Sequence, residues 1–190
     1  RYISILSING RHSHRLNPLI EKLCIPTLVI ADMDSAEKEG HHKAACPERG
    51  KDLISGNYTI AQWLVKEKDL DRLLAIPSAK KEIIKETPYK YSIRVAYQTP
   101  VTIDYDGTVK EAIASTFEDC LVYTNYQLFK GISTDDTGSL VKSVSDEIDS
   151  ANSFEDFHKG VYEILRNGKS DQKAEFALDL IYAVDPNQLI

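Results

Sequence analysis

The most informative stretch of the sequence is Leu28-Val29-Ile30-Ala31-Asp32-Met33-Asp34-Ser35, an apolar run that ends at two carboxylates spaced two residues apart. A short apolar run rich in β-branched residues is typical of a central strand in a parallel sheet. Because side chains alternate along a strand, we expect Asp32 and Asp34 to leave it on the same side, at its carboxyl end. Ligands bind at that end of an open α/β sheet.

Two carboxylates held this close repel each other unless a cation or a proton lies between them. A hard divalent metal ion, which prefers oxygen ligands, removes the repulsion. In the alternative interpretation, one aspartate caps a following helix and the other is solvated. The pair therefore predicts a metal site, with the capping role as the competing structural explanation.

The composition limits the class of protein. The chain has 190 residues, of which 42% are hydrophobic, and no apolar run approaches the length of about 20 residues that a membrane helix needs. The sequence opens without a signal peptide, and its three cysteines are too far apart for a zinc site or a disulfide framework, so we expect a cytoplasmic protein without a membrane partner. The net charge of −6 argues against a broadly basic surface for nucleic acid, although an acidic metal site remains compatible with such a substrate.

The remaining patterns predict an α/β first half and a mostly helical second half. In the first half we expect strands at 2–8 and 27–31, a helix at 14–23, a loop at 35–57, and helices starting at Thr59 and Asp69. Further on we expect strands at 91–97 and 101–105, a turn at Asp106-Gly107, an acidic helix within 115–125, and helical segments at 141–165 and 171–183.

A family resemblance spans most of the chain, from Asn9 to Asp179. Five stretches carry it: Val29 to Ser35, the helix start Ser55-Gly56-Asn57-Tyr58-Thr59, Val95-Ala96-Tyr97-Gln98, Thr116-Phe117-Glu118-Asp119, and Lys173 to Asp179. In this order the motifs resemble the Toprim catalytic region of the overcoming-lysogenization-defect (OLD) family of nucleases. The resemblance implies an α/β fold, with a Toprim-type parallel sheet core that carries a helical insertion. We accordingly expect core segments at 1–59 and 171–190, and the insertion at 60–170.

The resemblance also implies a chemistry, namely DNA cleavage with two Mg²⁺ or Mn²⁺ ions, in a role that points towards phage defence. Two such ions activate a water and hold the leaving oxygen of an in-line displacement. Asp32 and Asp34 resemble the metal-binding acids, with Ser35 and Glu37 as further ligand candidates. Glu118, Asp119 or both would complete the second metal site, although the residues alone favour a simpler explanation, negative charge matched to the N-terminus of a helix. Lys173 resembles a late lysine that neutralises the scissile phosphate.

Two departures from the family pattern limit this inference. No acid lies between Arg1 and Ile8, so we expect the glutamate of the first Toprim strand upstream of this sequence. The family's N-terminal ABC-type ATPase, which would bind ATP and through which members often form a homodimer, is likewise expected in a preceding segment.

The basic stretch 80–94 is the candidate surface for DNA, because contacts with phosphates need only positive charge. Its candidate residues are Lys80, Lys81, Lys85 and Arg94, and a solvated face explains them equally well.

Two other functions compete with the nuclease. One is a haloacid-dehalogenase-type phosphohydrolase, with Asp32 as nucleophile and Asp34 as acid/base. The other is a module that binds cations or partners without catalysis.

Overall fold

The chain folds into two compact units that meet in sequence between Thr99 and Pro100. The computed structural model describes residues 2–8, 11–130, 132 and 139–183. Strands that pair in parallel and several helices make this an α/β fold, as the sequence predicts. The predicted Toprim segments 1–59, 60–170 and 171–190 stay a prediction.

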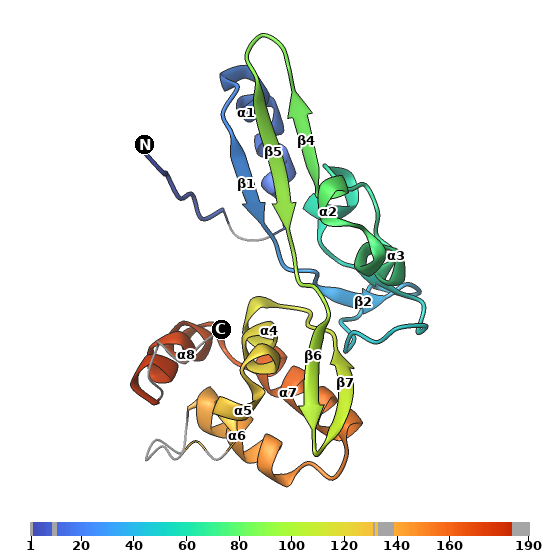
Figure 1. Cartoon of the computed structure of the whole chain (residues 1–190), viewed down its shortest axis with the longest axis vertical. Helices are drawn as coiled ribbons and strands as arrows, with labels where there is room; N and C mark the ends of the chain where they lie inside the picture. The colour runs from blue at the N-terminus through green and yellow to red at the C-terminus, as the bar shows by residue number, and fades with distance from the viewer. Residues whose placement is uncertain (1, 9–10, 131, 133–138, 184–190) are drawn as a thin grey trace. The chain divides into compact units, whose positions relative to one another are not determined.

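The main sheet of the first unit has three strands in the order β1-β5-β4 (Figure 1). Strand β1 (Thr27–Ile30) pairs in parallel with β5 (Tyr91–Ala96), and β4 (Glu82–Lys85) pairs antiparallel with β5. Among the described residues β1 is therefore an edge strand, and the expected central position is wrong for this part of the chain. Its outward residues Leu28 and Ile30 are 59% and 75% exposed.

Helices flank this sheet where the sequence predicts them. The expected helix at 14–23 forms as η1 (Ser13–Leu16) followed by α1 (Asn17–Leu23). Next come α2 (Tyr58–Gln62), α3 (Leu70–Ala75) and η2 (Ser78–Lys81). Asn57 and Asp69 cap α2 and α3, because their side chains accept bonds from the Thr59 and Arg72 amides.

Two further expectations for the first unit are wrong. Residues 2–8 form no strand; Tyr2, Ile3 and Ile5 are exposed, and no described strand pairs with this segment, so its alternating pattern gains no partner. The expected loop 35–57 contains an antiparallel pair, β2 (Ser35–Glu37) and β3 (Leu53–Ser55). Burial of residues such as Ala36 and Ile54 stabilises this pair despite the charges and glycines between the strands.

The second unit is a β-hairpin packed with helices. Strands β6 (Val101–Tyr105) and β7 (Thr108–Ala112) are joined by Asp106 and Gly107, whose φ angles of 48° and 78° suit the tight hairpin turn predicted there. The helices are α4 (Phe117–Thr124), α5 (Tyr126–Phe129), α6 (Leu140–Ser150), α7 (Phe154–Asn167) and α8 (Ser170–Ala183). Their core contains the fully buried rings of Tyr123, Phe129, Phe157 and Phe176.

The described helices are all too short or too polar to cross a lipid bilayer. None of the three cysteines lies in a disulfide bond in this structure.

Candidate functional site

The candidate site is built on residues 31–34, which join β1 to β2 and are called the acid loop below. The regular strand ends at Ile30, although the Ala31 amide still donates to the Ala96 carbonyl at 3.0 Å. Asp34 has a φ of +50°, in the left-handed region. The expected strand alternation therefore does not orient Asp32 and Asp34, because both lie beyond the strand.

Gly56 holds the end of the acid loop through its backbone. Its amide donates to the Asp34 carbonyl at 2.8 Å. A Cβ atom at this position would lie 2.9 Å from the same oxygen, which is too close. Glycine at position 56 thus allows β3 to approach the acid loop closely enough for this bond.

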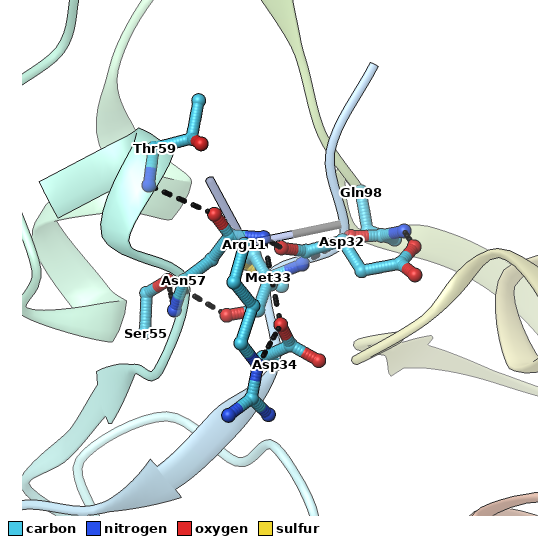
Figure 2. A network of polar contacts seen from close by, with 8 residues as sticks. All are labelled: Arg11, Asp32, Met33, Asp34, Ser55, Asn57, Thr59 and Gln98. Atoms are coloured by element: carbon cyan, nitrogen blue, oxygen red, sulfur yellow. Dashed lines mark hydrogen bonds and ion pairs between the residues drawn. The ribbon is translucent and has the colours of Figure 1, made fainter. Parts of the chain in front are cut away.

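Gln98, just after β5, fixes the first half of the acid loop (Figure 2). Its Nε2 donates to Asp32 Oδ1 at 2.6 Å, and its Oε1 accepts from the Met33 amide at 2.8 Å. Because both ends of one buried amide contact neighbouring residues, the Asp32 carboxylate is oriented relative to the backbone that follows it.

Ser55 and Asn57 fix the second half of the loop from β3 and the start of α2. Ser55 Oγ donates to the Met33 carbonyl at 2.7 Å. Asn57 Nδ2 donates to the Asp32 carbonyl at 2.9 Å and contacts Asp34 Oδ2 at 3.4 Å, as Figure 2 shows. Asn57 Oδ1 meanwhile accepts from the Thr59 amide, so one buried side chain connects the helix cap to both acids.

Within the described part of the chain, Asp34 has one cationic partner, Arg11. Arg11 Nε lies 3.1 Å from Asp34 Oδ2, and the arginine side chain is mostly exposed. Both side-chain contacts of Asp34 use Oδ2, and among the described residues Oδ1 has no hydrogen-bond partner. An exposed guanidinium is a weak counter-ion that another cation can replace.

The donor set of the acid loop fits Mg²⁺ or Mn²⁺. Carboxylate oxygens are hard ligands, and Mg²⁺ is usually held by one or two carboxylates together with waters and substrate phosphates. Two neighbouring carboxylates meet that requirement, and the Arg11 cation already lies against one of them. The described ranges contain no group of three or more His, Cys, Asp or Glu side chains suited to a metal, so a closed, all-protein metal cage is absent from them.

The other two ligand candidates near the acid loop lie on β2. Ser35 begins this strand and is buried, whereas Glu37 at its far end is exposed, with its amide bonded to the Lys43 carbonyl. Their roles as metal ligands stay predictions.

The second predicted acid pair, in α4, belongs to the second unit. Asp119 is 1% exposed and forms a capping box with Thr116. Its carboxylate accepts from the amides of Ser115 and Thr116 at 2.8 and 2.7 Å and from Thr116 Oγ1 at 2.8 Å. Burial raises its pKa to about 6, although these hydrogen bonds act in the opposite direction.

Glu118 differs from Asp119 in its surroundings. It is only half-buried, and among the described residues it forms neither a hydrogen bond nor an ion pair. Of the two acids, Glu118 is therefore better placed to accept a ligand, whereas the contacts of Asp119 are those of a helix cap.

The predicted DNA-contacting cations have different environments. Lys81 is buried with its Nζ 3.7 Å from the centre of the Tyr97 ring, and burial together with Arg94 lowers its pKa. Lys85 pairs with Glu21 at 3.0 Å, and Arg94 donates to Ser78 Oγ. Lys80 is exposed. Lys80 and Arg94 thus remain the most accessible of the four, and their contact with DNA stays a prediction.

Lys173 lies in the first turns of α8, where its amide donates to the Lys169 carbonyl at 3.0 Å. Its side chain is half-buried and forms no ion pair with the described residues. The role that the resemblance implies for this lysine stays a prediction.

Sequence reasoning assigned no role to the residues that hold the acid loop in place. These are Arg11, Ser55, Asn57 and Gln98. Ser55, Asn57 and Gln98 lie within the stretches that carry the family resemblance, and that was the signal that could have singled them out. Hydrophobic periodicity could not identify these residues, because each one bonds to a residue of the acid loop that lies 22 to 66 positions away in the sequence.

The comparison with known proteins finds one informative relative. The chain is 26% identical over 183 residues to the endonuclease GajA of Bacillus cereus (strain HuB5-5). The alignment covers 95% of this chain and 24% of GajA, so the chain spans about a quarter of the length of that relative. No family model and no solved structure matches the chain. This chain is thus a distant relative of an endonuclease.

Proposed function

We propose that the acid loop holds the catalytic metal ions of a DNA endonuclease. The observation that carries the proposal is the fixed pair Asp32 and Asp34, oriented by Gln98 and Asn57, in a chain similar to GajA. Its reaction would be hydrolysis of a phosphodiester with Mg²⁺ or Mn²⁺. An assignment to the Toprim region of the OLD family, with a role in phage defence and an ATPase elsewhere in the protein, belongs to the same proposal.

Different residues of the acid loop and its neighbours would have different roles in that reaction. Asp32 and Asp34 would bind the cations, which supply positive charge to the phosphoryl oxygens and to the attacking water. Gln98 holds the Asp32 carboxylate in place through the bond to Oδ1, and Asn57 holds Asp34. Such outer partners orient metal ligands and typically contribute about 10- to 100-fold to metal affinity or activity.

The resemblance gives further roles to two residues of the second unit. Glu118 is the preferred acid of α4 for the second cation, because the Asp119 oxygens already accept three hydrogen bonds. Lys173 would stabilise the negative charge that develops on the phosphate in the transition state.

Plasmid cleavage tests the proposal. Supercoiled DNA is incubated with the protein and Mg²⁺, Mn²⁺, Ca²⁺ or EDTA, and the products are separated on agarose. We expect cleavage with Mg²⁺ or Mn²⁺ that Asp32→Ala reduces by at least about 100-fold and that Lys173→Ala also reduces. Glu48→Gln, a change in an exposed carboxylate paired with Lys51, is the matched control and should cleave normally.

A small phosphomonoester distinguishes the competing enzyme. Hydrolysis of that compound, lost in Asp32→Ala and accompanied by no DNA cleavage with either metal, would contradict the nuclease and support a phosphohydrolase. Absence of both activities would leave a binding module as the remaining interpretation.

A further inference from the structure

A cleft lies beside the acid loop, and the proposed chemistry assigns no ligand to it. Its volume is about 290 Å³, and it is bounded by β3, α2 and the segments that flank them. Ser55, Gly56 and Asn57 form one wall. Asn57 Nδ2 also contacts Asp34 Oδ2, so this wall of the cleft touches the acid loop.

The rest of the cleft lining combines an aromatic ring with positive charge. Tyr58 is 48% exposed, and its ring stacks on that of His12, with 6.0 Å between the ring centres and 9° between the planes. Lys68 and His42 line the same cleft, and Lys68 has no carboxylate partner within the described part of the chain. Gln62 adds an exposed amide.

This combination suits an unpaired nucleotide. A base stacks on an aromatic side chain whatever its identity, and cations beside it contact the phosphates that follow. The volume lies at the lower limit of pockets for small molecules, which is appropriate for one base with its sugar and too small for a base pair. Lys68 supplies the positive charge of this cleft lining.

We infer that this cleft binds one unpaired nucleotide of the DNA strand, adjacent to the phosphate held at the acid loop. Tyr58 stacks on the base, Lys68 and His42 contact the flanking backbone, and Asn57 connects the bound strand to Asp34. The inference rests on the proposed function and adds to it a preference for locally single-stranded DNA.

Binding without cleavage tests this inference. Fluorescence anisotropy of a fluorescein-labelled 12-nucleotide single strand is measured in EDTA, with the full chain and its variants. Tyr58→Leu should weaken binding by about 5- to 100-fold, the range for loss of one stacked base, whereas Tyr58→Phe keeps the ring and should bind as the unchanged protein does. Tyr89→Leu removes another exposed tyrosine ring, which lies outside the cleft, and is the control.

The charge of the cleft gives a second readout. Lys68→Gln should weaken binding. It should also reduce the slope of log affinity against log salt concentration by about 1, the value for the loss of one phosphate contact. Lys51→Gln should change neither the affinity nor the slope. The melting temperatures of all variants confirm that each one is folded.

The outcomes separate this inference from the proposed function. If Tyr58→Leu binds the strand as tightly as Tyr58→Phe does, or if a blunt duplex or a single-stranded RNA binds with higher affinity than the DNA strand, the inference is wrong. If cleavage proves independent of Asp32 while strand binding still depends on Tyr58, the proposed function fails and the nucleotide site stands.

Discussion

The acid loop and the start of α4 each contain two carboxylates close together in sequence, but these carboxylates differ in burial and in hydrogen-bond partners. In α4, Asp119 is buried, and its oxygens accept bonds from the backbone and the hydroxyl of its own turn. In the acid loop, Asp32 and Asp34 are partly exposed and are held by amide side chains from distant segments. A carboxylate that caps a helix contributes mainly to stability. A partly exposed carboxylate that is held by side chains of other segments remains accessible to a ligand.

The first prediction sharpens this contrast at Gln98. Replacing Gln98 by alanine removes the bond to Asp32 Oδ1 and the acceptor of the Met33 amide. We expect cleavage to fall by about 10- to 100-fold, the usual range for a residue that orients a metal ligand. Initial rates of plasmid nicking measure the effect, and Gln127→Ala, which removes an exposed amide outside the acid loop and the cleft, serves as the control. Normal nicking by Gln98→Ala would mean that Asp32 needs no orienting partner.

The second prediction concerns stability in α4. Asp119→Ala removes the capping box and leaves the buried Ser115 amide without its acceptor. We expect a loss of about 2 kcal/mol in the free energy of unfolding, measured by urea denaturation. Glu118→Ala changes a neighbouring acid without these contacts and should cost less than about 0.5 kcal/mol. Equal losses in the two variants would contradict the capping role.

The third prediction is a pH dependence with a defined sign. The pKa of Asp119 is raised by burial to about 6, so the folded chain binds this proton more tightly than the unfolded chain does. The stabilisation is complete below pH 4 and is lost as the pH rises through 6, by about 3 kcal/mol in total. Urea unfolding between pH 4 and 7 in EDTA should show this slope in the unchanged protein and a smaller one in Asp119→Asn.

Local signals account for the parts of the structure that the sequence predicts well. The Asp106-Gly107 turn and the caps of α3 and α4 depend on residues within four positions of one another. The β2–β3 pair and the contacts of Gln98 depend instead on residues far apart in sequence, such as the 66 positions between Asp32 and Gln98. The sequence could therefore identify the two acids, but it could not identify the residues that hold them.

The fourth and smallest prediction concerns Arg11. The ion pair with Asp34 is largely exposed on the arginine side, so Arg11→Gln should change the free energy of unfolding by less than about 1 kcal/mol. Removal of a competing cation should tighten Mn²⁺ binding at the acid loop by about 2- to 5-fold. Calorimetric titration with Mn²⁺ measures this change. Weaker Mn²⁺ binding by Arg11→Gln would instead mean that the guanidinium supports the acid loop.

The most direct test of the central claim is Mn²⁺ binding itself, followed by electron paramagnetic resonance in the unchanged protein, Asp34→Asn and Asp119→Asn. If the acid loop is the metal site and Asp119 is a helix cap, Asp34→Asn loses bound Mn²⁺, and Asp119→Asn keeps it whenever the variant is folded. Retention of Mn²⁺ by Asp34→Asn together with its loss in folded Asp119→Asn would contradict this assignment and place the metal at α4.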